Sequence, residues 1–124
     1  MIHIPEIDKA ISKHAMWKMH LRTAIDTGKS DWDPETVRLD NLCDFGKWLY
    51  ALQGSEQASP DWIRVNKLHA VFHDVAAKVL QFALSGQKEL AEEALNGNRS
   101  EFKQASAQLT NAMVAWKMKL APEQ

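Results

Sequence analysis

The chain has 124 residues, of which 45% are hydrophobic and 25% are charged, and its formal net charge is −1. This composition is typical of a single globular domain over residues 1–124, and it excludes general disorder. Lysine and arginine are spread along the chain without a basic cluster, and no apolar run is long enough to cross a bilayer. We therefore expect binding neither to nucleic acid nor to membranes.

The N-terminal residues, from Met1 to Glu6, lack the basic region and the apolar segment of a signal peptide. The chain also has a single cysteine, which cannot form an internal disulfide and fits a reducing compartment. Both observations predict a cytoplasmic protein.

Helical periodicity extends along nearly the whole sequence, and no run of alternating residues is typical of a strand. The first helix is predicted over residues 7–27 and should end at Gly28, because glycine is favoured just past a helix end. A loop rich in turn-forming residues follows over 29–34. The apolar stripe of this first helix contains Ile7, Ile11, His14, Trp17, Leu21, Ala24 and Ile25.

A short second helix is predicted over residues 41–52, with Asp40 as its N-cap and Gly54 just beyond its end. Because Gly46 has no side chain, a neighbouring backbone could approach this helix closely. One face of the helix carries Leu39, Leu42, Cys43, Gly46, Leu49 and Tyr50.

The third helix should begin at Ser59-Pro60-Asp61, which combines a capping hydroxyl, a proline at the first helical position and a carboxylate near the positive end of the helix dipole. It should extend to about Leu84, followed by a short helical piece over 87–95 and a last helix that begins after Ser100 and ends before Pro122. The apolar stripe of the third helix contains Trp62, Val65, His69, Phe72, His73, Ala76, Val79, Leu80 and Ala83. Amphipathic helices with short links predict an all-α fold, namely an antiparallel four-helix bundle with an additional short helix.

Four chemically active side chains interrupt these apolar stripes, namely His14, Cys43, His69 and His73. Residues four apart share one face of a helix, so the imidazoles of His69 and His73 can point at one object. Three imidazoles and a thiolate are ligands that zinc prefers, and they suffice to close a tetrahedral shell. Each of these residues alone is more often part of an ordinary core, so the pattern by itself leaves a zinc site and three hydrogen-bonded core histidines both open.

The remaining histidines and the acidic neighbours are weaker candidates. His20 belongs to a different face of the first helix than His14, and His3 precedes that helix, so we interpret both as surface or loop residues. Asp44 and Asp74 neighbour two of the candidate ligands but project from other helical faces. We interpret them as solvated, or at best as supporting the ligands.

The sequence around the four residues resembles a known family. His14-Ala15-Met16-Trp17 gives H-x-x-W, residues 42–49 give L-C-x-F-G-K-W-L, and the pair His69 and His73 completes the order His, Cys, His, His. This pattern is similar to that of the chemoreceptor zinc-binding (CZB) domain, which is found in bacteria attached to chemoreceptors and diguanylate cyclases, and sometimes alone. The resemblance extends over nearly the whole chain.

The resemblance implies a helical bundle, often a homodimer, that binds one Zn²⁺ per subunit. Its zinc ligands would be His14, Cys43, His69 and His73, and the residues supporting them would be Trp17, Phe45, Gly46 and Trp48. It further implies a cytoplasmic sensor of zinc, and in some cases of hypochlorous acid through the zinc-bound cysteine, in bacterial chemotaxis or cyclic-di-GMP signalling. The sequence contains no recognisable output domain, so it leaves the signalling partner unidentified.

Two other functions remain open at this stage, a structural zinc in an interaction module and a small zinc hydrolase. Four protein ligands leave no open position for an activated water, and no carboxylate is placed as an obvious general base, so we expect no enzymatic activity. Zinc would draw the first three helices together, and its affinity should fall as the pH drops through the histidine range.

Overall fold

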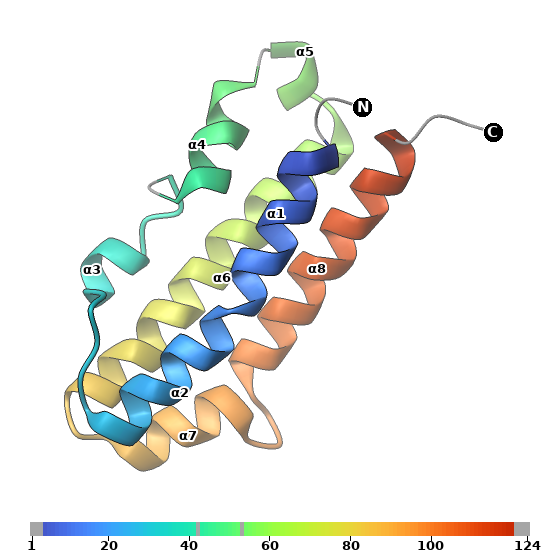
Figure 1. Ribbon diagram of the computed structural model, residues 1–124. Coiled ribbons are helices and arrows are strands. Elements are labelled where there is room, and N and C mark those ends of the chain that lie inside the picture. Colours follow the sequence, from blue (N-terminus) through green and yellow to red (C-terminus); the bar gives the residue numbers. More distant parts are fainter. Residues whose placement is uncertain (1–3, 42, 53, 121–124) are drawn as a thin grey trace.

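The structure is a computed structural model, and it describes residues 4–41, 43–52 and 54–120 (Figure 1). In this part of the chain it contains eight helices and no strand. The helices are α1 (Ile4–Ala15), α2 (Trp17–Thr27), α3 (Pro34–Val37), α4 (Asp44–Ala51), α5 (Gly54–Gln57), α6 (Pro60–Leu84), α7 (Lys88–Asn96) and α8 (Glu101–Leu120).

The helices form a bundle of four segments that run in alternating directions, as Figure 1 shows. The first segment is α1 followed by α2, the second is the chain of short helices α3, α4 and α5 (called the strap below), the third is α6 and the fourth is α8. The long helix α6 packs against α8, α2, α7 and α3, and the short helix α7 closes the end between α6 and α8. The predicted all-α bundle is confirmed.

Local signals in the sequence set several helix ends correctly. The Ser59 hydroxyl accepts a hydrogen bond from the Trp62 amide at 3.0 Å and so caps α6, and Ser100 does the same for the Lys103 amide at 3.0 Å at the start of α8. Gly28 ends α2 with a φ of 72°, the left-handed conformation that glycine adopts without steric cost.

Two helix predictions were wrong in their boundaries. The first predicted helix is divided at Met16 and begins earlier, at Ile4. The second begins at Asp44 instead of residue 41, because its N-cap is Cys43, whose sulfur accepts a hydrogen bond from the Gly46 amide at 3.3 Å. Asp40 therefore does not cap this helix.

Gly54 begins the short helix α5 instead of only following α4. The predictions made for His3, Leu42 and Pro122 lie outside the described residues.

The core lies between α6 and the helices around it. Its largest fully buried side chains include Phe72 and Leu80 on α6, Leu109 and Met113 on α8, and Leu21 on α2. Within the described ranges, none of the helices combines the length and the apolar character that crossing a bilayer requires.

Candidate metal centre

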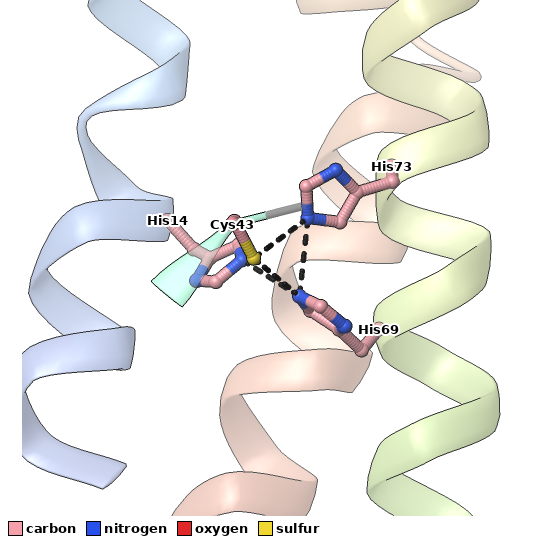
Figure 2. A group of neighbouring side chains, drawn as sticks. All are labelled: His14, Cys43, His69 and His73. Atoms are coloured by element: carbon pink, nitrogen blue, oxygen red, sulfur yellow. Dashed lines mark hydrogen bonds between the residues drawn. The ribbon is translucent and has the colours of Figure 1, made fainter. Parts of the chain in front are cut away.

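Three of the four bundle segments each contribute to one cluster of side chains (Figure 2). His14 comes from the last turn of α1, Cys43 from the N-cap of α4, and His69 and His73 from adjacent turns of α6. One potential ligand atom from each residue lies within 4.8 Å of the others. The structure thus brings together all four residues that the sequence singled out.

Four distances within the cluster are close to those of a tetrahedral shell of nitrogen and sulfur. The Nε2 atom of His69 lies 3.1 Å from Nε2 of His14 and 3.1 Å from Nε2 of His73. The sulfur of Cys43 lies 3.4 Å from Nε2 of His69 and 3.5 Å from Nε2 of His73. Zn–N bonds of about 2.05 Å and Zn–S bonds of about 2.3 Å in a tetrahedron place two nitrogens about 3.3 Å apart, and nitrogen and sulfur about 3.5 Å apart. The donor set and its spacing therefore fit Zn²⁺.

Outer hydrogen bonds aim two of the imidazoles inward. Nδ1–H of His14 donates to the Ala10 carbonyl at 2.8 Å, and Nδ1–H of His73 donates to the Val37 carbonyl at 2.8 Å. A neutral imidazole carries one ring proton, so these bonds leave the Nε2 lone pairs facing the centre of the cluster. Two lone pairs facing each other repel unless a cation or a proton lies between them, which is the arrangement expected of metal-ligating histidines.

Burial keeps the three imidazoles neutral. His69 is fully buried, and His14 and His73 are nearly so. Burial lowers the pKa of His14 to about 4 and that of His69 to about 2, and it also lowers the pKa of His73. Near neutral pH the histidines are thus already in the form that binds a metal, and no proton has to leave them.

The thiol of Cys43 is in the opposite situation. Burial is the main reason why its pKa is raised, and the nearby carboxylates of Asp40 and Asp44 add to the effect. Without a cation the group is therefore a thiol near neutral pH, and it must release one proton to become a ligand.

Gly46 allows the backbone before Cys43 to approach α4. A Cβ atom at this position would overlap the carbonyl oxygen of Asp40 and would lie 2.8 Å from its carbonyl carbon and 3.1 Å from Cα of Asn41. The predicted close approach at Gly46 is therefore present, and it holds the turn that delivers the Cys43 sulfur.

Aromatic rings cover part of the cluster. The buried ring of Phe45 lies edge-on to His14 and His69, with ring centroids 5.9 and 5.1 Å apart, and it stacks on Trp48 at 5.5 Å. Phe72, which the sequence placed only in the core, lies 5.1 Å from His14 and 6.0 Å from His73 between ring centroids. Its position on the stripe between the two histidines of α6 is the signal that could have identified it.

Trp17, expected beside the ligands, lines the same groove as His14 and Cys43, and its ring contacts those of His20 at 5.1 Å and Trp32 at 5.3 Å. His20 thus belongs to a separate aromatic group, in agreement with its interpretation as a residue outside the cluster. Asp44 and Asp74 are exposed and pair with Lys13 at 3.4 Å and Arg38 at 3.7 Å, in agreement with their interpretation as solvated.

A groove of about 730 Å³ opens beside the cluster. Its walls include the side chains of His14 and Cys43, and the Lys13–Asp44 ion pair lies at its edge. Cys43 is only partly buried and is one of the residues that line this groove. Sequence patterns could not predict the groove, because it forms where α1 meets the start of α4.

The family model of the chemoreceptor zinc-binding domain matches residues 14–80, which begins at His14 and includes all four cluster residues. This match is shorter than the resemblance over nearly the whole chain that the motifs indicated. Searches of curated proteins and of solved structures found no match. The match covers more than half of the sequence, and its zinc-binding character agrees with a buried cluster of three histidines and one cysteine. The chain therefore belongs to the chemoreceptor zinc-binding domain family.

Proposed function

We propose that residues 1–124 form one sensory domain in which His14, Cys43, His69 and His73 hold a single Zn²⁺. The observation that carries this proposal is the convergence of three imidazole Nε2 atoms and one sulfur, with two of the imidazoles oriented by outer hydrogen bonds. Three neutral imidazoles and one thiolate leave a net charge of about +1 on such a shell. The bound cation supplies the positive charge that stabilises the Cys43 thiolate.

The first input that we propose is zinc itself. The four residues come from α1, the strap and α6, so the metal ties the strap to two rigid helices. At its α3 end the strap keeps the hydrogen bond from His73 to Val37 without the metal. At the start of α4, the ion pair between Lys13 and Asp44 is exposed and contributes little, whereas farther along α4 the buried Leu49 carbonyl accepts a hydrogen bond from the Trp62 indole. Loss of zinc should therefore release mainly the region around Cys43.

A second proposed input is oxidation of Cys43. Cys43 lines the groove, and its thiolate would react with hypochlorous acid to give a sulfenic acid and chloride. The oxygen of hypochlorous acid is transferred to the sulfur and the chlorine leaves with the electron pair as chloride, so no other oxidant is needed. A sulfenic acid is a weaker ligand than a thiolate, so oxidation and zinc loss should release the same part of the strap.

The expected setting is cytoplasmic, with bacterial chemotaxis or cyclic-di-GMP signalling as the output and a homodimer as the functional form. These proposals rest on the family, in which zinc binding and chemoreceptors are linked. The competing functions are a purely structural zinc and a small zinc hydrolase. Two observations argue against the hydrolase. Four protein ligands leave no coordination position on the metal for a water molecule, and the carboxylates of Asp44 and Asp74 project to solvent and pair with cationic side chains.

Elemental analysis of zinc in the purified protein tests the ligand set. We expect one zinc per chain in the wild type and a reduced content in Cys43→Ala and His73→Ala. His20→Ala is the matched control, since His20 is a histidine of the same chain that lies outside the cluster and should leave the zinc content unchanged. Full zinc content in both cluster variants would contradict the proposal.

Hydrogen exchange with and without a chelator separates sensing from a structural role. A sensor should keep the protection of α6 and α8 when zinc is removed and lose protection in the strap. A structural zinc predicts instead that all helices lose protection together.

A further inference from the structure

Two buried polar atoms on one turn of α6 lack a hydrogen-bond partner in the part of the chain that the structure describes. They are Nδ1 of His69 and Oδ1 of Asn66. His69 differs in this respect from His14 and His73, whose Nδ1 atoms each donate to a backbone carbonyl. Buried polar atoms without partners are rare, so two of them so close in sequence call for an explanation.

The two atoms are complementary in kind. When Nε2 of His69 faces a metal, its single ring proton is on Nδ1, and that nitrogen is a donor. The amide oxygen of Asn66 is an acceptor. Each atom thus offers what the other lacks.

Helix geometry brings the two side chains to neighbouring positions. Residues three apart are neighbours on a helix surface, and side chains lean toward the N-terminus of their helix. The ring of His69 therefore lies over the turn that carries Asn66.

The surroundings of Asn66 indicate which end of its amide faces His69. The Tyr50 hydroxyl donates to the carboxylate of Asp40 at 2.9 Å. Burial and this carboxylate raise the pKa of Tyr50, whereas the neighbouring Asn66 side chain acts to lower it. An amide N–H directed toward the phenol oxygen would have this effect, and that orientation of Asn66 leaves its amide oxygen for His69.

We propose that Asn66 is a positioning residue of the metal centre, whose Oδ1 accepts a hydrogen bond from Nδ1–H of His69 in the zinc-bound protein. This inference rests on the proposed ligation of zinc by His69. It gives the third imidazole the outer acceptor that the Ala10 and Val37 carbonyls give to the other two.

The same hydrogen bond would also link His69 to Cys43 through the strap. In this arrangement His69 donates to Asn66, the amide nitrogen of Asn66 is directed toward Tyr50, and Tyr50 donates to the carboxylate of Asp40. The backbone carbonyl of Asp40 in turn lies 4.0 Å from the Cys43 sulfur. Asn66 thus connects the metal-facing side of α6 to the turn that carries the cysteine.

The test uses the full chain, labelled with ¹⁵N in histidine and loaded with Zn²⁺. In the wild type we expect Nε2 of His69 to show the shift of a metal-bound nitrogen and Nδ1–H to exchange slowly with water. Asn66→Ala should speed that exchange and lower the zinc affinity by about 10- to 100-fold. Asn66→Asp, which keeps an acceptor, should restore slow exchange, and Asn111→Ala on the exposed surface of α8 is the matched control.

Several outcomes would overturn the proposal. One is a zinc-loaded Asn66→Ala protein with wild-type affinity and a slowly exchanging His69 Nδ1–H. If that variant does not fold, the wild type alone decides, because a metal-bound Nε2 with rapidly exchanging Nδ1–H refutes the role of Asn66. A His69 with no metal signature at Nε2 would instead refute the proposed ligand set, so the two failures are distinguishable.

Discussion

Substitution of Gly46 by alanine tests whether the close approach of the strap backbone holds the metal centre together. The added methyl group would overlap the Asp40 carbonyl, and backbone cannot move aside as the end of a flexible side chain can. Overpacking of this kind costs about 1–3 kcal/mol. With a loss of about 2 kcal/mol and a urea m-value of about 1.5 kcal/mol/M, the unfolding midpoint should fall by about 1.3 M.

Urea unfolding should be measured with zinc and with a chelator, together with zinc affinity by competition. Without metal the turn before Cys43 can shift to relieve the overlap, so the loss of stability should be larger when zinc is bound. Gly54→Ala is the control, because a Cβ atom at Gly54 meets nothing within 4 Å. If Gly46→Ala unfolds at the wild-type midpoint and binds zinc as tightly as the wild type, the close approach has no role in the site.

Three further predictions follow from the protonation states and one buried hydrogen bond. The histidines are already in their metal-binding form, whereas the Cys43 thiol must release one proton. A plot of log zinc affinity against pH should therefore have a slope of about one between pH 6 and 8, and a slope near three would contradict this assignment. The metal-free protein should be fully stabilised above pH 6.5 and should lose stability as the pH falls toward 4. The reason is that the pKa values of His14 and His69 in the folded protein lie below the ordinary 6.5, so the unfolded chain takes up protons first. Urea unfolding at several pH values in the presence of a chelator checks this. Trp62→Phe should destabilise the protein by about 1–2 kcal/mol in urea unfolding, because it removes the 3.0 Å hydrogen bond from the indole N–H to the buried Leu49 carbonyl. An unchanged unfolding midpoint would show that water replaces this hydrogen bond in the variant.

The sequence predicts those parts of this molecule that depend on signals within a few residues. Ser59 and Gly28 mark helix ends through a capping hydroxyl and a left-handed φ, and both positions are correct. The division of the first helix at Met16 could not be predicted, because neither glycine nor proline is present there. The start of α4 was missed because a carboxylate is a commoner N-cap than a sulfur, whereas here the sulfur of Cys43 takes that role.

In the candidate site, too, local sequence patterns predict some features and not others. The four side chains could be found because histidine and cysteine are conspicuous on apolar stripes with a period of 3.6 residues. Their outer partners at Ala10 and Val37 could not, since these are backbone carbonyls and every residue has one. The groove beside Cys43 also depends on the packing of α1 against α4, which no local pattern specifies.

The sulfur of Cys43 has two duties in the structure, because it lies in the metal cluster and also caps α4. A chemical change at this one atom therefore removes the acceptor for the Gly46 amide and loosens the first turn of a helix only 8 residues long. Farther along the same helix, Trp48 packs against Trp116 of α8 with ring centroids 5.7 Å apart. The helix that the Cys43 sulfur caps thus lies directly against the last helix of the bundle, through two indole rings.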